Sequence, residues 1–312
     1  RTASATSRLI PSARLLPRMF IVIMEKENKK FYITTAIDYV NGPPHIGHAL
    51  EKIQADVLAR YHRQKGEDVW FLTGTDEHGA KIARAAESAG KNLQEFVDEM
   101  SAKFRAMKDI LNLSWDDFIR TSDKERHWPG AQKIWNEMRQ TIGDIYKKNY
   151  RGLYCVGHES FITEKDLVAG KCQDHQTEPE VIAEENYFFK LSKYTDSIRR
   201  RLGVARSPDD LPYLDDEPIF KIFPHSRENE ILSLINSGLE DISFSRPAKD
   251  LSWGIPVPND PEHTMYVWCD ALSNYITAVG YGRDEQLFEQ WWPADMHVIG
   301  KDILRFHAAI WP

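Results

Sequence analysis

The sequence predicts an α/β fold in which helices connect the strands of a parallel sheet. Two observations lead to this prediction. A short aromatic and β-branched segment, 31–35, precedes apolar residues at helical spacing over 46–61, and a second strand-like segment follows at 69–73. The same alternation returns late in the chain, where the strand-like segments 265–268 and 296–299 each precede a helix. Strand–helix–strand units of this length join parallel strands.

The first helix is predicted to begin after the loop that contains Pro43 and Pro44, and to end at Gly66. Its apolar residues recur every three or four positions, and we expect them to form one buried face. These residues are Ile46, Ala49, Leu50, Ile53, Val57, Leu58 and Tyr61.

Beyond the second strand, the pattern predicts a helix over 93–111, a strand at 118–121 and a long helix over 129–148. The character of the sequence then changes. Residues 149–250 hold short strand-like pieces, clustered acids and prolines, with one helix predicted near 227–236. We therefore interpret 149–250 as a module inserted into the α/β domain.

The composition limits the classes of function. The chain has 312 residues, of which 42% are hydrophobic and 28% charged, enough for one large domain or two ordinary ones. No run of eighteen apolar residues is present, so we expect no membrane span. A net charge of −7 does not favour binding nucleic acid over a large surface. Three cysteines do not make a disulfide framework, which indicates a reducing compartment such as the cytoplasm.

The first residues are treated as a leader. They are rich in arginine and serine and contain no acid up to Arg18, a composition typical of a mitochondrial transit peptide. Alternatively, Met19 or Met24 is the natural start. The expected location is thus cytoplasmic, with a mitochondrial location as the alternative. The predicted organisation is a leader at 1–28, the first half of the α/β domain at 29–148, the insertion at 149–250 and the start of the second half at 251–312.

The sharpest motif is Pro-His-Ile-Gly-His at 44–48, between the first strand and its helix. Ligands of parallel sheets bind beyond the carboxyl ends of the strands, where a helix N-terminus offers free N–H groups and a positive dipole end. His45 and His48 share one side of the first turn, and Gly47 lets a phosphate approach the backbone. The pair indicates a site for a phosphate oxyanion. The alternative, that the histidines only cap the helix, stays open.

A second constellation consists of two pairs, each separated by two residues: Cys155 with His158, and Cys172 with His175. This spacing is typical of a structural zinc knuckle. Two thiolates and two imidazoles complete a tetrahedral Zn²⁺ and leave no position open for catalysis. Such an ion would stabilise a module too small for a large hydrophobic core. The alternative is two buried cysteines beside two surface histidines.

Several separated motifs, in order, resemble the class I aminoacyl-tRNA synthetases, and the methionyl members in particular. Besides the His-Ile-Gly-His signature, they are Thr-Ala-Ile-Asp-Tyr-Val-Asn-Gly at 35–42, Thr-Gly-Thr-Asp-Glu-His-Gly at 73–79, Tyr-Val-Trp-Cys-Asp-Ala at 266–271, and Gly-Lys-Asp at 300–302 followed by Phe-His at 306–307. The resemblance covers about 31–312. It implies a Rossmann-type parallel sheet, interrupted by a connective insertion with the zinc knuckle and incomplete at its C-terminal end.

The resemblance implies a ligase that activates L-methionine with ATP, accompanied by Mg²⁺, to methionyl-adenylate and transfers methionine to tRNA(Met). His45 and His48 would be catalytic. The implied ATP-binding residues are His45, Gly47, His48, Glu51, Gly300, Lys301 and Asp302. The implied methionine-binding residues are Ala36, Ile37, Tyr39, Asp76, Trp268, Ala271, Tyr275, Ile303 and His307. Asp76 is the only acid of this second set, so we expect it to pair with the substrate ammonium.

Some features depart from the family's pattern. Ile37 and Asp38 stand where the family commonly has other residues, so the edge of the pocket is expected to differ. His158 stands where the family often has a cysteine. The family's lysine-bearing Lys-Met-Ser-Lys-Ser loop is not among the 312 residues. We therefore expect methionine binding by this chain but little adenylate formation.

Other functions remain to be weighed. Aliphatic-specific class I synthetases would carry a longer insertion with an editing domain, and the cysteinyl enzyme a cysteine shortly before the signature loop, where 31–42 has none. A small nucleotidyltransferase would lack the insertion. A non-catalytic binding module would have no need of His45 and His48. The oligomeric state is left open.

Overall fold

The computed structural model describes residues 29–158, 160–203 and 220–312, so the predicted leader at 1–28 lies outside the described residues. One part of the fold is a five-stranded sheet in which every paired strand runs parallel to its neighbour. The strands are β1 (Lys30–Thr35), β2 (Asp38–Tyr39), β3 (Asp68–Asp76), β4 (Asp117–Arg120) and β14 (Met296–Val298). Their order is β14–β1–β3–β4, and β2 pairs with the last residues of β3. The predicted parallel α/β sheet is confirmed.

Helices pack on both faces of this sheet. One face carries α1 (Ile46–Gln64) and α3 (Leu93–Ile110), and the other carries α7 (Val267–Thr277) and α8 (Glu285–Trp291). Side chains alternate along β1, so that Phe31 and Ile33 pack toward α1 and α3, whereas Tyr32 packs toward α7. Because both faces are covered, the last five residues of β1 and the last six of β3 are all buried.

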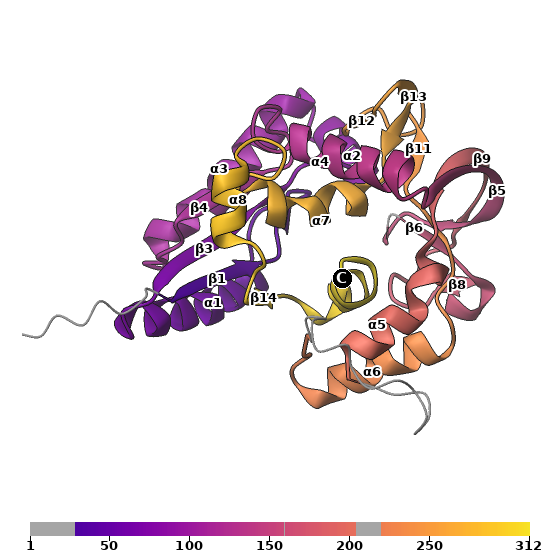
Figure 1. Cartoon of the computed structure of the whole chain (residues 1–312). Coiled ribbons are helices and arrows are strands. Elements are labelled where there is room, and N and C mark those ends of the chain that lie inside the picture. Colours follow the sequence, from indigo (N-terminus) through magenta and orange to yellow (C-terminus); the bar gives the residue numbers. More distant parts are fainter. Residues whose placement is uncertain (1–28, 159, 204–219) are drawn as a thin grey trace, which may run out of the picture.

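A second, antiparallel sheet has the order β10–β9–β5–β6. Its strands are β5 (Ile145–Cys155), β6 (Ser160–Ile162), β9 (Glu180–Phe189) and β10 (Ile242–Ser243). In Figure 1 this sheet lies at one side of the molecule and the parallel sheet at the other, with α7 and the last segment of the chain between them. The domain boundaries at residues 149 and 250 stay predictions.

The remaining elements are short and join the two sheets. The helices are α2 (Ala80–Ser88), α4 (Trp128–Asn136), α5 (Thr195–Arg201) and α6 (His225–Asn236). The strands are β7 (Leu167–Val168), β8 (Lys171–Cys172), β11 (Ser245–Pro247), β12 (Pro256–Val257) and β13 (Asp260–Met265). Single 3₁₀ or π turns cover Glu137–Thr141, Glu164–Asp166, Leu191–Tyr194, Lys301–Ile303 and Phe306–Ile310.

The predicted helix over 129–148 is wrong in its second half. Helix α4 ends at Asn136, one π turn follows, and the chain from Ile145 onward forms β5. Gly143 has a φ of +72°, a conformation that glycine adopts readily and that ends the helix. The residues after it pair with β9, and this tertiary pairing outweighs the helical periodicity.

The predicted parallel strand at 265–268 is also wrong. Met265 ends β13, which pairs antiparallel with β11 and β12, and α7 begins at Val267. The strand predicted at 296–299 is confirmed, because β14 pairs parallel with β1 and helical turns follow it from Lys301. The elements predicted at 93–111, 118–121 and 227–236 are confirmed as α3, β4 and α6.

Helix α1 has the predicted position, but it buries a different face. Four residues expected in the core are mostly exposed: Ile46 at 88%, Leu50 at 57%, Val57 at 60% and Tyr61 at 55%. The buried residues are Lys52, Ala55, Asp56 and Ala59. Alanines let the helix lie close to the sheet, and the two buried charges have partners, so a face that is poor in large apolar residues packs inward. Gly66, with a φ of +79°, follows the end of α1 as predicted.

None of the helices in the described ranges is long and apolar enough to cross a membrane.

Candidate active site

His45 and His48 lie at the N-terminus of α1, beyond the carboxyl end of β1. The Nδ1 of His45 accepts a hydrogen bond from the Gly47 N–H at 3.1 Å, and the Nδ1 of His48 accepts one from the His45 N–H at 3.1 Å. The ring centroids are 3.8 Å apart. A Cβ on Gly47 would lie only 3.0 Å from the His45 ring, so glycine makes room for it. Because each Nδ1 accepts a hydrogen bond, the neutral rings carry their protons on Nε2.

A buried polar layer lies beneath the two histidines. Lys52 Nζ is 2.8 Å from Asp38 Oδ1 and 2.7 Å from Oδ2, and His48 Nε2 is 3.9 Å from the same carboxylate. Glu51 Oε1 accepts a hydrogen bond from the Ala36 N–H at 3.2 Å. Burial lowers the pKa of His48 to about 4 and raises the pKa of Glu51 to about 7. At neutral pH, His48 is therefore uncharged, and Glu51 is divided between its two protonation states.

The segment from Gly300 to Asp302, predicted to bind the nucleotide, leaves the sheet beside these residues. It follows β14, which pairs with β1, and the Ala36 N–H donates to the Val298 carbonyl at 3.0 Å. A Cβ on Gly300 would meet no atom within 4 Å. The side chains of Lys301 and Asp302 are exposed. This segment therefore borders open space at the same edge of the sheet as His45.

Four of the residues predicted for the amino-acid pocket lie on the α7 side of the sheet, whereas Tyr39 packs against the cluster on the opposite side. Ile37, Trp268, Tyr275 and Ile303 belong to one hydrophobic cluster. The ring of Trp268 stacks on Phe306 with a centroid distance of 3.7 Å and an interplanar angle of 6°. Phe306 was not among the predicted pocket residues, although it precedes one of them. The cluster brings these four predicted residues together, and their role as walls of an amino-acid pocket stays a prediction.

Tyr275 and His307 form a polar end of this cluster. The Nδ1–H of His307 donates to the Ile303 carbonyl at 2.9 Å, so its Nε2 accepts from the Tyr275 hydroxyl at 2.7 Å. Burial lowers the pKa of His307 to about 4. The imidazole is therefore neutral, and the two hydrogen bonds fix its tautomer and orientation.

Asp76 ends β3 at the carboxyl edge of the sheet and lies opposite Tyr39 of β2. Its side chain is buried, as are Ala36 and Ala271. Burial raises the pKa of Tyr275, and the charges of Glu51 and Asp76 raise it further. The hydrogen bond from the Ala36 N–H to Glu51 Oε1 joins one residue of each predicted set, so the two groups of residues meet at this point.

The four predicted metal ligands also come together, and their ligand atoms all lie within 4.8 Å of one another. Sγ–Nδ1 distances are 3.7 Å for Cys155 and His175, 3.6 Å for Cys172 and His158, and 3.7 Å for Cys172 and His175. A tetrahedral zinc with ordinary bond lengths separates sulfur from nitrogen by about 3.6 Å. Asp174 Oδ2 lies 2.9 Å from His158 Nε2 and can orient that ring. The residues fit a tetrahedral Zn²⁺.

One buried network was missed from the sequence. Asp270 Oδ2 is 2.6 Å from His78 Nδ1, and its Oδ1 is 2.7 Å from His127 Nε2. Burial alone would raise the pKa of Asp270, but the two histidines hold it below its usual value. A single acid in the otherwise apolar segment 266–271 was a usable signal, because a buried carboxylate needs partners.

The chain matches known proteins over most of its length. The family described as tRNA synthetases class I (M) matches residues 31–178 and 164–312. The methionine–tRNA ligase of Thermotoga maritima is 47% identical over 287 residues, which is 91% of this chain and 43% of that protein. The Brucella suis ligase is 48% identical over 290 residues, 91% of this chain and 53% of that protein. The chain spans about half the length of the curated relatives it matches.

Solved structures agree with this match. Mycobacterium tuberculosis methionyl-tRNA synthetase in complex with methionyl-adenylate has a TM-score of 0.80 at 43% identity, covering 91% of this chain and 53% of that chain. The apo form has a TM-score of 0.72 at 40% identity, covering 93% and 53%. The parallel sheet, the histidine pair at the start of α1 and the family match lead to one conclusion: the chain belongs to the class I (M) family of tRNA synthetases.

Proposed function

We propose that this chain carries the ATP- and methionine-binding part of a methionine–tRNA ligase. A carboxylate oxygen of methionine attacks the α-phosphorus of ATP, the bond to pyrophosphate breaks, and methionyl-adenylate forms. A terminal ribose hydroxyl of tRNA(Met) then attacks the acyl carbon, loses its proton and displaces AMP. The related enzyme bound to methionyl-adenylate supports this choice of reaction.

The observation that carries the proposal is the histidine pair at the N-terminus of α1. Negative charge builds up on the α-phosphate oxygens in the transition state, and fixed donors aimed at it stabilise it. The Nε2–H groups of His45 and His48, together with the positive end of the α1 dipole, can supply this stabilisation. Gly47, Glu51 and Gly300 to Asp302 would hold the nucleotide. Mg²⁺ bound to ATP would neutralise further phosphate charge.

The amino-acid pocket supports methionine as the substrate. The unbranched thioether packs well on aromatic rings, and the partly buried Trp268 offers such a surface. The buried carboxylate of Asp76 would bind the substrate ammonium by a charge-assisted hydrogen bond. Methionine would thus be recognised at both ends, with its carboxylate left toward the phosphate site.

We also infer that Cys155, His158, Cys172 and His175 hold a structural Zn²⁺. The Sγ–Nδ1 distances of 3.6 and 3.7 Å support this inference. With four protein ligands the ion would have no position for substrate, so it would cross-link the loop after β5 to the β7–β8 hairpin. That hairpin has two residues in each strand and gains little stability from its own packing.

Calorimetric titration of the chain with single amino acids tests the proposal. We expect methionine to bind and leucine, isoleucine and valine to bind at least about tenfold more weakly, the discrimination that one methylene or a branch gives in an apolar pocket. Methionine-dependent exchange of pyrophosphate into ATP, measured on the same sample, reports whether bound methionine reacts. Preference for another amino acid in both assays would refute the assignment.

A further inference from the structure

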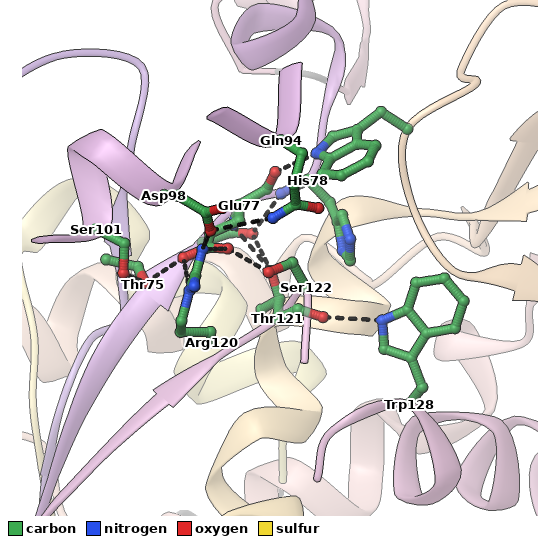
Figure 2. Close-up of polar contacts among 12 residues, drawn as sticks. Thr75, Glu77, His78, Gln94, Asp98, Ser101, Arg120, Thr121, Ser122 and Trp128 are labelled. Atoms are coloured by element: carbon green, nitrogen blue, oxygen red, sulfur yellow. Dashed lines mark hydrogen bonds and ion pairs between the residues drawn. The ribbon is translucent and has the colours of Figure 1, made fainter. Parts of the chain in front are cut away.

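The turn that carries Asp76 is anchored by a buried carboxylate, Glu77, which is 0% exposed. Its Oε1 accepts hydrogen bonds from Thr75 Oγ1 at 2.7 Å and from Arg120 Nε at 2.7 Å. Its Oε2 accepts from Arg120 Nη2 at 2.9 Å and from the Ser122 hydroxyl. Figure 2 shows Glu77 enclosed by these side chains. Each oxygen of the Glu77 carboxylate thus accepts two hydrogen bonds.

Arg120 extends this contact to three elements, and we call the Glu77–Arg120 pair the brace. Its guanidinium binds Glu77 with two nitrogens, and Nη2 also binds Asp98 of α3 at 2.5 Å (Figure 2). The pair therefore joins the end of β3, the end of β4 and helix α3. A buried ion pair is weak evidence for added stability, because desolvation offsets much of the attraction. Its bidentate geometry instead fixes the direction of the chain at Glu77.

The brace acts on Asp76 through the main chain. The Glu77 N–H donates to Thr121 Oγ1 at 2.8 Å, and the same hydroxyl lies 3.5 Å from Asp76 Oδ1. Neighbouring side chains of an extended segment point to opposite sides. Thr75 contacts both Glu77 and Ser101 of α3, so Glu77 lies on the face of the sheet that α3 covers. Holding Glu77 on that face therefore turns Asp76 to the opposite face, on which α7 packs.

The other neighbour of Glu77 connects the turn to the pocket wall. His78 binds Asp270 at 2.6 Å, and Asp270 belongs to α7, the helix that also carries Trp268 and Tyr275. The turn is thus fixed on one side to β4 and on the other to α7. The position of Asp76 relative to the aromatic wall depends on both attachments.

We propose that Glu77 is a positioning residue for amino-acid recognition: held by Arg120, it sets the direction of the Asp76 carboxylate toward the substrate ammonium. The inference rests on the proposed function and deepens it. In this proposal Asp76 contacts the ammonium, whereas Glu77 orients the Asp76 carboxylate. Loss of Glu77 should therefore affect ligands that have an ammonium group and spare those that lack one.

The test compares methionine with 4-(methylsulfanyl)butanoate, which keeps the thioether and the carboxylate but has no ammonium. Glu77→Gln keeps the size of the side chain and turns a donor toward Arg120. We expect the Kd of methionine to rise about tenfold, as when one charge-assisted hydrogen bond is misaligned, and the Kd of the analogue to stay within about twofold. Equal losses for both ligands, or no loss for methionine, would overturn the inference.

A matched control distinguishes an effect on the orientation of Asp76 from a general loss of stability. Glu184 forms a comparably buried ion pair with Arg246 at 2.7 Å on the antiparallel sheet. Glu184→Gln should lower the melting temperature without changing the ratio of the two Kd values. If Glu77→Gln does not fold, Arg120→Lys, which keeps the charge but loses the bidentate contact, should still shift the ratio. If the unmodified chain binds methionine but the variants leave the ratio of the two Kd values unchanged, only this inference is overturned. If the unmodified chain does not bind methionine at all, the proposed function is overturned as well.

Discussion

Gly157→Ala is expected to disrupt the zinc site without removing any ligand. A Cβ at this position would lie 2.2 Å from His175 Cγ and 2.5 Å from its Nδ1, whereas ordinary contacts begin near 3.4 Å. The imidazole would have to retreat by about 1 Å, or the loop after β5 would have to open. Zinc–nitrogen bonds tolerate changes of only about 0.2 Å. The substitution should therefore remove His175 from the coordination shell.

The size of the effect follows from the part of the zinc-binding free energy that one of the four ligands contributes. Structural zinc sites bind with about 10–16 kcal/mol, so one ligand accounts for roughly 3 kcal/mol. This corresponds to about a hundredfold weaker zinc binding. The main chain itself is not strained, because the φ of Gly157 is not in the left-handed region. The loss of zinc affinity in Gly157→Ala therefore measures the effect of the contact between the added Cβ and the His175 ring.

Zinc competition with a chromogenic chelator measures the effect. Cys155→Ser removes a ligand directly and should leave the purified protein without stoichiometric zinc. Gly42→Ala is the neutral control, since its Cβ would meet nothing within 4 Å. If folded Gly157→Ala bound zinc within about threefold of the unmodified chain, the ring contact would not set the affinity and the argument would be refuted.

Three further predictions concern the active site. In the full-length protein, His45→Ala or His48→Ala should slow adenylate formation by about two to three orders of magnitude in single-turnover kinetics and leave methionine affinity nearly unchanged; a parallel loss of affinity would place them in the pocket. Asp76→Asn should weaken methionine binding by about tenfold or more in calorimetry, and unchanged binding would show that the ammonium lies elsewhere. Burial raises the pKa of Glu51 from 4.5 to about 7, so its contribution to stability falls as pH rises across that interval. Glu51→Gln should thus stabilise the fold by about 3 kcal/mol at pH 8 and by only about 1 kcal/mol at pH 5, and equal thermal shifts at both pH values would contradict this.

The sequence predicted the elements whose signals are local. The strand at 31–35 and its partner at 69–73 are short, apolar and bounded by loops, and both lie in the parallel sheet. Periodicity failed where tertiary contacts decide. Ile145 continues a helical pattern but pairs with β9, and Ile46 continues an apolar stripe that is exposed. A pattern identifies a helix face, but it does not say which face the rest of the chain will cover.

The same distinction applies to the site. Residues grouped in short motifs, such as His45 with His48 or Cys155 with His158, could be found from spacing, and the structure brings each group together. The contact between His78 and Asp270 spans 192 positions, and no spacing within one segment announces it. Only the fold, by placing α7 beside the end of β3, brings these two residues into contact.

The alternative that the histidines only cap α1 is not an alternative to phosphate binding, because capping prepares them for it. Each Nδ1 is occupied by a main-chain N–H, which leaves each neutral ring with a proton on Nε2. A free imidazole would divide between two tautomers, and the one with its proton on Nδ1 would present an acceptor to the phosphate. The low pKa of His48, about 4, keeps that ring neutral before ATP arrives. The helix start thus fixes two oriented donors in advance, as electrostatic stabilisation of a transition state requires.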